Sequence, residues 1–255
     1  MCLILVAHEH HPRYRLVVAA NRDEFYARPT APAHFWTDAP NVLGGRDLRA
    51  GGSWLGLTRG GRFAAVTNYR ETKPPPVNAR SRGELVGDYL RGGAPPDDYL
   101  REVESRGDVY AGFNLLVGDR ETLWFFSNRH SEIRRLEPGI HGLSNGAFDA
   151  SWEKVERGMR ALRPALAGDG LEVDDLFRIL SDRRTAGAAD LPDTGMARDQ
   201  ELLLSAPFIE SADYGTRAST VIWIGRDGSG AFIELSVAPG GDRREERFDL
   251  VVSDR

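Results

Sequence analysis

Short apolar runs recur along the chain, and polar residues or glycine and proline separate them. The first run covers residues 1–7, and the second covers residues 16–20 and ends abruptly in the polar residues 21–24. Apolar runs of this length with polar ends are typical of buried β-strands. We therefore expect the first two runs to pair as a hairpin through residues 8–15.

The same pattern predicts further strands in the middle and at the C-terminal end of the chain. They are expected at residues 55–58, 62–68, 113–117, 122–127, 132–136, 140–144, 219–224, 231–236 and 247–252. Turn signals separate the strands between residues 113 and 144 at short intervals, and this spacing predicts an antiparallel meander.

Helical periodicity occurs in separate segments of the chain. Ser81-Arg82-Gly83-Glu84 has the form of a capping box and precedes an apolar stripe that ends at Leu90. Further helices are expected at residues 96–106, 152–167 and 173–183.

Other stretches carry no regular pattern. The proline-rich passage 28–40 is expected to be irregular, and the glycines at 44–45 and 51–52 suggest tight turns and close backbone approach. Residues 185–216 are long and acidic, with a short apolar segment near Leu202. A loop of that length is typically functional or disordered.

The order strands, helices, strands, helices, strands favours an α+β fold. Antiparallel sheets packed face to face with helices outside would bury every apolar face, so we predict a layered sandwich. The chain has 255 residues and no break in composition, and we expect a single domain spanning residues 1–255.

Composition and charge narrow the class of protein. The net charge is −5, and Arg and acidic residues are interspersed along the chain. No basic stripe therefore indicates binding to a nucleic acid. The apolar start is too short to span a bilayer and lacks the organisation of a secretory signal. A single cysteine forms no intramolecular disulfide, which favours a reducing compartment and a cytoplasmic protein.

The cluster His8-Glu9-His10-His11 invites a metal site. It is not the metalloprotease pattern, because the second His would have to stand where Pro12 is. No other cluster supplies clear further ligands, so a solvated hairpin turn is the favoured interpretation. We predict no metal and no other cofactor.

Cys2 is the principal candidate for chemistry. Removal of the initiator Met is favoured before a residue as small as Cys, and it would leave a thiol and an α-amine on one residue. An α-amine titrates near ~7.7 to 8.0 and a free thiol near ~8.5, so the amine can accept the thiol proton. One residue would then supply nucleophile and base. From Cys2 alone, a small buried residue at the start of a strand is the simpler interpretation.

Arg22 and Asp23 strengthen the catalytic interpretation. In the predicted hairpin both lie beside Cys2 at the open end. A guanidinium near the sulfur favours the thiolate, and a carboxylate near the α-amine holds and orients it. A solvated strand end that carries a salt bridge explains the same residues about equally well.

Further motifs accompany these residues along the chain. They are Gly44-Gly45-Arg46-Asp47, Gly52-Ser53-Trp54-Leu55-Gly56, Thr67-Asn68-Tyr69-Arg70, Ser144-Asn145-Gly146 and Tyr214-Gly215-Thr216-Arg217. Together with Cys2 and Asn21-Arg22-Asp23-Glu24, they resemble the NRDE family, the homologues of transport and Golgi organisation protein 2, over nearly the whole chain. That family resembles N-terminal nucleophile hydrolases of the penicillin V acylase, bile salt hydrolase and acid ceramidase type. The resemblance implies a four-layer αββα sandwich.

The resemblance also implies roles for individual residues. It assigns the nucleophile to Cys2, its supporting pair to Arg22 and Asp23, the oxyanion donors to Asn68 and Asn145, and a late arginine to Arg217. Those hydrolases usually separate the supporting Arg and Asp by two residues, whereas here they are adjacent. Glu24 is therefore an alternative for the acidic role.

Aromatic residues near these positions are expected to line an apolar acyl pocket from loops. The expected substrate-binding residues are Glu24, Trp54, Tyr69 and Trp36. Capping the core is the alternative for each aromatic side chain.

The resemblance suggests two main functions. The first is an N-terminal cysteine hydrolase that cleaves a non-peptide linear amide or acyl bond through a thioester. The second is a non-catalytic carrier of haem or of a lipid or acyl-CoA type ligand, and a scaffold surface without ligand is a third possibility. The expected partner is a small acyl or amide molecule or an apolar ligand, and the sequence leaves the oligomeric state open.

Overall fold

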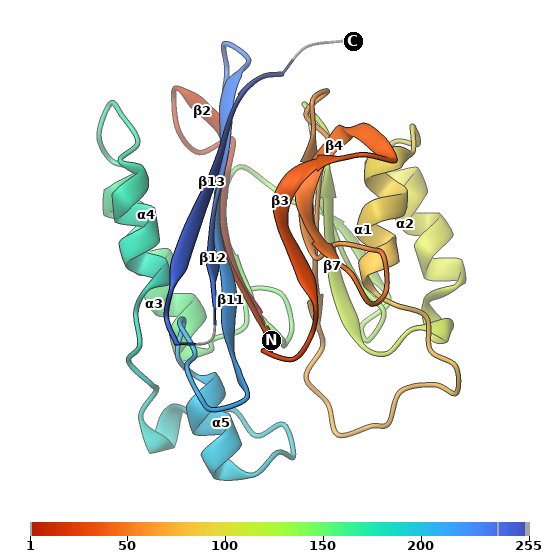
Figure 1. Cartoon of the computed structure of the whole chain (residues 1–255), viewed down its shortest axis with the longest axis vertical. Coiled ribbons are helices and arrows are strands. Elements are labelled where there is room, and N and C mark those ends of the chain that lie inside the picture. Colours follow the sequence, from red (N-terminus) through yellow and green to blue (C-terminus); the bar gives the residue numbers. More distant parts are fainter. Residues whose placement is uncertain (1, 239, 253–255) are drawn as a thin grey trace. The chain divides into compact units, whose positions relative to one another are not determined.

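The computed structural model of the chain describes residues 2–238 and 240–252. The chain folds as two compact units, and each unit is assembled from segments that are separated in the sequence (Figure 1). The first unit comprises Met1–Ala27, Arg70–Thr72 and Pro138–Leu250, and the second comprises Arg28–Tyr69, Lys73–Glu137 and Val251–Arg255. The single domain spanning residues 1–255 stays a prediction.

The first unit is built on a six-stranded sheet in the order β10-β1-β2-β11-β12-β13. Its strands are β1 (Cys2–His8), β2 (Tyr14–Phe25), β10 (Gly139–Leu143), β11 (Tyr214–Gly225), β12 (Ser229–Val237) and β13 (Arg243–Val251). The predicted hairpin of the first two apolar runs is confirmed, since His8 lies opposite Leu16 and Cys2 opposite Arg22.

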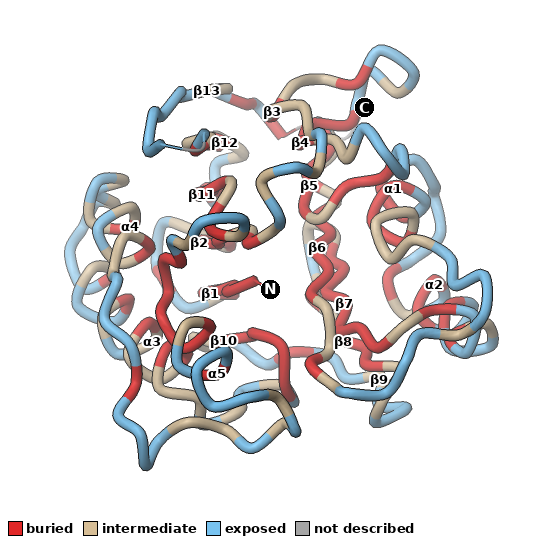
Figure 2. The backbone as a smooth tube through the Cα atoms, turned by 60° about the horizontal axis from the view of Figure 1, so that its bottom comes forward, coloured by how far each residue is buried: buried red, intermediate tan, exposed pale blue. Residues whose placement is uncertain are grey.

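Helices α3 (Glu153–Ala165) and α4 (Val173–Leu180) cover one face of this sheet (Figure 1). Val155 and Leu162 of α3 and Leu176 of α4 belong to one buried cluster with Leu3 and Leu5 of β1. Figure 2 marks the strands at this contact as buried and the outer side of α4 as exposed or intermediate. The apolar side chains of β1 therefore set the face on which the helices pack.

The second unit is built on a seven-stranded sheet in which every strand neighbours the next one along the chain. Its strands are β3 (Thr30–Trp36), β4 (Ala39–Asp47), β5 (Leu55–Thr58), β6 (Phe63–Asn68), β7 (Phe113–Gly118), β8 (Leu123–Ser127) and β9 (Glu132–Arg135). Helices α1 (Gly83–Arg91) and α2 (Pro96–Ser105) pack on one face through Val86, Tyr89 and Leu100.

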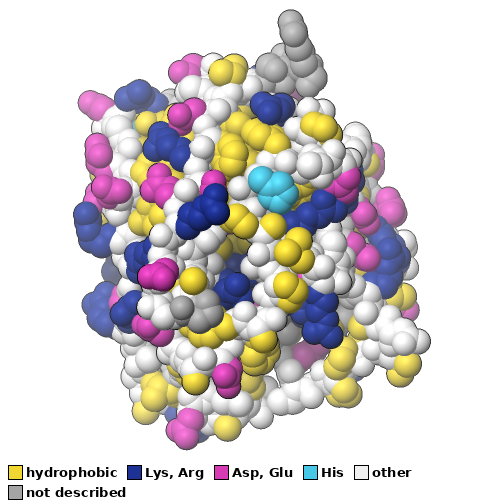
Figure 3. Space-filling model, in the orientation of Figure 1, with side chains coloured by type: hydrophobic (Ala, Val, Ile, Leu, Met, Phe, Trp, Pro, Cys, Tyr) yellow, Lys and Arg dark blue, Asp and Glu magenta, His cyan; other side chains and the backbone are white. Residues whose placement is uncertain are grey.

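Two antiparallel sheets, each with its own helices, confirm the α+β class. Among the described residues, no helix is both long and apolar enough to cross a membrane. On the face shown in Figure 3, Lys and Arg side chains are interspersed with Asp and Glu. That face therefore carries no extended surface of one charge.

The proline-rich passage is a pair of strands, so the prediction of an irregular segment was wrong. β3 is an edge strand, and its pairing with β4 is irregular between Ala31 and His34. Pro32 lies within that irregularity, where a missing backbone N–H is tolerated. Gly44 lies inside β4 rather than in a tight turn, and an ideal Cβ on it would be 2.7 Å from the Leu55 carbonyl oxygen.

β10 departs from the predicted meander. β7, β8 and β9 form it as expected, but β10 pairs with β1 in the first unit, where Ile4 lies opposite Leu143. The meander prediction was therefore wrong for this strand. As a consequence, the residues after β10 arrive beside Cys2.

Two further local predictions were wrong. α1 begins without a side-chain cap, and Glu84 contacts Arg80 and Tyr110 instead of closing a capping box. Residues 185–216 contain a short 3-10 helix (Ala188–Asp190) and helix α5 (Arg198–Leu204), so this segment is not wholly irregular. α5 was missed because it is only 7 residues long and mostly polar.

Gly52→Ala is expected to destabilise the second unit, because backbone atoms fill the space that a side chain would take. An ideal Cβ on Gly52 would lie 2.4 Å from the carbonyl carbon and oxygen of Gly83 at the start of α1. We expect urea unfolding to show a loss of about 1–3 kcal/mol. Gly93→Ala is the control, since nothing lies within 4 Å of its ideal Cβ. Equal stability of the two variants would refute the steric account.

Candidate active site at the open end of the β1–β2 hairpin

The hairpin places Cys2 opposite Arg22 at its open end, as predicted. Directly opposite residues of an antiparallel pair share a face of the sheet. Leu3 and Leu5 face the helices, so Cys2 and Arg22 point to the other face and Asp23 lies on the helix side. The thiol of Cys2 is free and buried, with a residue exposure of 7%.

The residues that follow β10 hold the main chain of Cys2. The backbone N–H of Cys2 donates to Asn145 Oδ1 at 3.1 Å, and Ser144 Oγ donates to the Cys2 carbonyl oxygen at 2.8 Å. Asn145 is fully buried, and its carbonyl oxygen accepts a hydrogen bond from the Arg70 backbone N–H at 2.6 Å. The Cys2 backbone nitrogen, which the prediction makes an α-amine, is thus held by a side-chain oxygen.

Asp23 is the buried acid of the site. Its Oδ1 accepts a hydrogen bond from Thr216 Oγ1 at 2.7 Å, and its backbone oxygen accepts one from the Tyr214 hydroxyl at 3.1 Å. Burial raises the pKa of the Asp23 carboxyl, while the positive charges of Lys154 and Arg22 oppose that rise. The carboxyl is therefore held in a small network of polar and charged groups.

Glu24 occupies a different environment from Asp23. It is partly exposed and forms an ion pair with Arg22, with 3.7 Å between Nη2 and Oε2. By strand alternation it shares the face of Arg22 and Cys2. Of the two acids, Asp23 is the one that shares the buried network.

A bulge in β11 directs Arg217. The two neighbours of Arg217 oppose consecutive residues of β2, so Arg217 itself has no opposite residue. Its Nη1 donates to the carbonyl oxygens of Phe25 and Tyr26, each at 3.1 Å. Burial and then the charge of Arg22 lower the pKa of Arg217. The structure therefore brings together Cys2, Arg22, Asp23, Glu24, Asn145 and Arg217, all in the first unit.

The pKa of the Cys2 thiol is raised, although the sequence analysis expected Arg22 to favour the thiolate. Burial raises the pKa of the Cys2 thiol, and the Asp23 carboxylate raises it further. Arg22 lowers it, as expected, and so does a hydrogen bond from the Asp23 backbone, but burial outweighs both. A thiol in this environment needs a base in order to ionise near neutral pH.

The other predicted site residues belong to the second unit. Asn68 ends β6 opposite Phe113, and the Tyr69 hydroxyl bonds to His130 Nε2 at 3.1 Å. Trp54 directly precedes β5 and is partly buried. Their roles in oxyanion and substrate binding stay predictions.

Trp36 lies at the end of β3 rather than in a loop. Its side chain is fully buried in the cluster that α1 and α2 form with the second sheet, and its Nε1 donates to the Gly44 carbonyl oxygen at 3.0 Å. The guanidinium groups of Arg46 and Arg91 lie 4.4 and 4.7 Å from its ring centre. This environment is that of a core residue, the alternative interpretation given to each aromatic side chain.

Buried charged residues that received no role in the sequence analysis adjoin the site. Arg70 and Glu201 form an ion pair with side-chain exposures of 2% and 1%. Lys154 of α3 is equally buried, and its Nζ donates to the Leu204 carbonyl oxygen at 3.0 Å. Arg70 ends the Thr67-Asn68-Tyr69-Arg70 motif, whereas Lys154 and Glu201 lie outside every motif and carried no such signal.

The segment that contains the His cluster forms the β1–β2 turn. His11 Nε2 lies 3.0 Å from the Gly168 carbonyl oxygen, and its ring stacks near Tyr14. In the described part of the chain, no group of three or more His, Cys, Asp or Glu side chains has an arrangement that could hold a metal ion.

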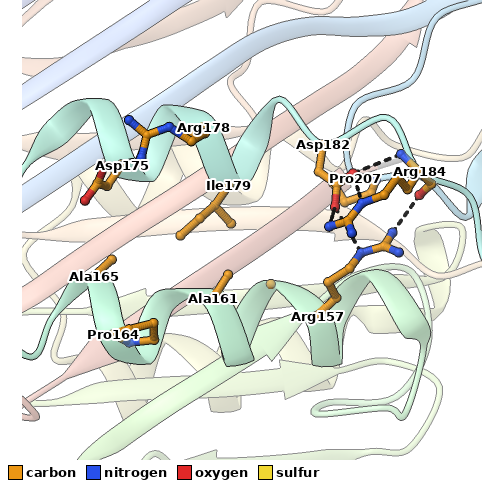
Figure 4. Close-up of a pocket in the computed structure, with 11 residues that line it drawn as sticks. Arg157, Ala161, Pro164, Ala165, Asp175, Arg178, Ile179, Asp182, Arg184 and Pro207 are labelled. Atoms are coloured by element: carbon orange, nitrogen blue, oxygen red, sulfur yellow. Dashed lines mark hydrogen bonds and ion pairs between the residues drawn. The ribbon is translucent and has the colours of Figure 1, made fainter.

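A surface hollow of about 380 Å³ lies between α3 and α4 (Figure 4). In it, Asp182 joins Arg157 and Arg184 through ion pairs, and small apolar residues such as Ala161 form its floor. None of its lining residues carries a thiol, hydroxyl, amine or imidazole. The hollow contains none of the predicted site residues.

Comparison with solved structures defines the fold. The chain is similar to an N-acylethanolamine-hydrolyzing acid amidase ortholog from Caenorhabditis elegans, with a TM-score of 0.53, 11% identity, and coverage of 87% of this chain and 92% of that one. It is also similar to a mutant of conjugated bile acid hydrolase from Clostridium perfringens, with a TM-score of 0.54, 8% identity, and coverage of 100% and 95%. The predicted fold class is thereby confirmed.

Sequence comparisons define the family. The family model for Transport and Golgi organisation 2 matches residues 1–239. The Transport and Golgi organization protein 2 homolog of Bos taurus is 36% identical, with 96% of each chain covered, and that of Homo sapiens is 35% identical, with 93% of each covered. The chain therefore belongs to the Transport and Golgi organisation 2 family, which confirms the resemblance seen in its motifs.

Proposed function

We propose that the protein is an N-terminal cysteine hydrolase that cleaves a non-peptide linear amide or acyl bond through a thioester acyl-enzyme. One observation carries the proposal: the Cys2 backbone nitrogen is held by Asn145 Oδ1 at 3.1 Å, within the same buried cluster as Asp23. Removal of Met1 turns that nitrogen into the amine that the mechanism needs as its base.

The proposed reaction has two halves. In the first, the neutral α-amine takes the thiol proton, and the sulfur attacks the substrate carbonyl to give a tetrahedral oxyanion. The α-ammonium then protonates the leaving nitrogen, the C–N bond breaks, and a thioester remains. In the second half the amine takes a proton from water, the hydroxide attacks the thioester, the C–S bond breaks, and the thiolate recovers the proton.

The chain's own residues would serve these steps in distinct ways. Asn145 turns its oxygen to the Cys2 nitrogen, so its NH₂ group is the donor proposed for the oxyanion. One such donor contributes roughly 2.7–4 kcal/mol to lowering a barrier. Asp23 orients the amine, and Arg22 favours the thiolate during attack.

The substrate class follows from the proposed chemistry. The two structural relatives are named as an N-acylethanolamine-hydrolyzing acid amidase ortholog and a mutant of conjugated bile acid hydrolase, which supports an amide of an apolar acyl group as the target. We also place the reaction in the cytoplasm, because a single free cysteine requires no oxidising compartment.

The second candidate is a carrier of haem or of a lipid or acyl-CoA type ligand. Burial of the Cys2 thiol, with its raised pKa, favours this candidate, because a neutral buried thiol also suits a packing role. A carrier needs no free amine on Cys2. The two candidates therefore differ in their response to a change at the N-terminus.

An N-terminal tag is expected to abolish turnover, because an amide nitrogen on Cys2 cannot accept the thiol proton. The measurement is hydrolysis of a panel of fluorogenic acyl amides of increasing chain length. The same tag at the C-terminus is the matched control and is expected to leave turnover intact. Equal activity of the two tagged proteins would contradict the hydrolase and leave the carrier standing.

A further inference from the structure

Lys154 lies where local physical chemistry disfavours a cation. It is in the first turn of α3, the end at which a helix dipole repels positive charge. Its residue exposure is 1%, and burial of an ammonium requires compensation by negative groups. Among the described residues, its hydrogen bond goes to the Leu204 carbonyl oxygen rather than to a carboxylate.

The choice of lysine is itself unusual in this chain. Lys73 and Lys154 are the only lysines among 33 Lys and Arg residues. Lys73 is exposed, whereas Lys154 is buried. Lysine differs from arginine in that burial readily shifts its pKa. The single buried lysine therefore stands at a place where its charge state can respond to its neighbours.

The charged groups around Lys154 come from four parts of the first unit. They are Asp23 of β2, Cys2 of β1, Arg70 of the 70–72 segment and Glu201 of α5. Glu201 pairs directly with Arg70. Asp23, which is also buried and lies on the helix side of the sheet, is the other carboxylate in this set, and its negative charge raises the pKa of Lys154.

We propose that Lys154 is a positioning residue of the candidate active site, whose buried ammonium keeps Asp23 ionised, the Cys2 amine neutral and the Cys2 thiol able to ionise. The inference rests on the proposed hydrolase function, since it assigns Lys154 a part in preparing that nucleophile. The positive charge of Lys154 would act on the three groups in different ways. An ammonium stabilises the nearby carboxylate and thiolate, and it disfavours a second ammonium at the α-amine.

The same charge relations act on Lys154 in return. Burial lowers the pKa of Lys154 to about 8, while the negative charges of Asp23 and Cys2 raise it. Its ammonium is therefore predominantly present at neutral pH. The ionisation of Lys154 and that of the Cys2 thiol therefore depend on each other, and titration of either group reports on the same cluster.

The first test is the pH dependence of thiolate absorbance at 240 nm, which needs no substrate and has one cysteine as its source. The Cys2→Ala spectrum is subtracted to remove the contribution of tyrosine. In Lys154→Met the midpoint is expected to rise by roughly one pH unit, because a nearby cation is lost. Lys73→Met is the matched control and is expected to keep the native midpoint. A folded Lys154→Met protein with the native midpoint would overturn the proposal.

The second test uses the native chain and so avoids the question of whether Lys154→Met folds. Lysine labelled with ¹³C at Cε gives two side-chain signals, and Lys154 is identified by the effect of pH on the buried one. The signal of Lys154 is expected to titrate near pH 8 and to move lower in Asp23→Asn, because the balancing anion is gone. An unchanged titration in Asp23→Asn would overturn the proposed pairing.

The two tests separate this inference from the proposed function. Neither titration uses a substrate, so a protein without hydrolase activity still shows both shifts if Lys154 balances Asp23. If turnover is found, the acid limb of its pH profile is expected to move upward in Lys154→Met with the thiol midpoint. A merely structural role at the end of α5 would lower stability and leave both pH profiles in place.

Discussion

Cys2→Ala is expected to reduce amide hydrolysis by a factor on the order of 10⁴ or more, because it removes the atom proposed to form the thioester. No other thiol can replace it, since Cys2 is the one cysteine of the chain. Initial rates on the best substrate of the acyl amide panel provide the measurement. Thermal unfolding should show a fold close to native, since only a small side chain is lost.

Cys2→Ser is the companion variant for this result. It keeps the α-amine, the size of the side chain and a polar atom, but a hydroxyl ionises far less readily than a thiol. We expect activity far below native and a Tm close to native. Turnover by Cys2→Ala at the native rate would show that the reaction takes place elsewhere.

Glu201→Gln is expected to lower the free energy of unfolding by about 3–5 kcal/mol, because it leaves the buried guanidinium of Arg70 without its partner charge. Burial already lowers the pKa of Arg70, and Glu201 opposes that effect. The Arg70 guanidinium also lies 4.5 Å from the Trp152 ring centre. Urea unfolding at neutral pH provides the measurement.

The double variant Arg70→Met/Glu201→Leu tests the cause of that loss. When both charges are replaced by apolar side chains, no uncompensated charge remains, and most of the stability is expected to return. The Arg70 backbone N–H would still donate to the Asn145 carbonyl oxygen. If Glu201→Gln unfolds with native stability, the ion pair does not stabilise the first unit as we describe.

The hairpin at the N-terminus could be predicted from the sequence because its signals are local. An apolar run, a polar turn and a second run that ends at Asn21 fix both the pairing and the register. The position of Cys2 opposite Arg22 followed directly. Helices α3 and α4 were similarly readable, since each carries an apolar face with helical spacing.

Long-range pairing could not be predicted in the same way. Whether β10 joins the first or the second sheet depends on long-range packing. Its short spacing from β9 favoured a place in the predicted meander, but β10 pairs with β1 instead. β3 and β4 were hidden by prolines and glycines that lower strand propensity but fit an irregular edge. Short-range patterns carry no information on such choices.

The pKa values of the site residues depend mainly on burial, which could not be predicted from the sequence. The motif suggested that Arg22 would favour the thiolate, whereas burial dominates and raises the thiol pKa. Lys154 lies 152 positions from Cys2 in sequence and acts on the cluster only through packing of α3. Its role follows from three-dimensional neighbours.

The central claim is that Cys2, as the processed first residue, is the nucleophile. Intact-mass analysis of the native protein, before and after treatment with an activated acyl ester, tests it most directly, with peptide mapping to locate any adduct. The account predicts loss of Met1 and one acyl group on the Cys2 sulfur, absent in Cys2→Ala. A protein that keeps Met1, or an acyl group carried on another residue, would contradict it.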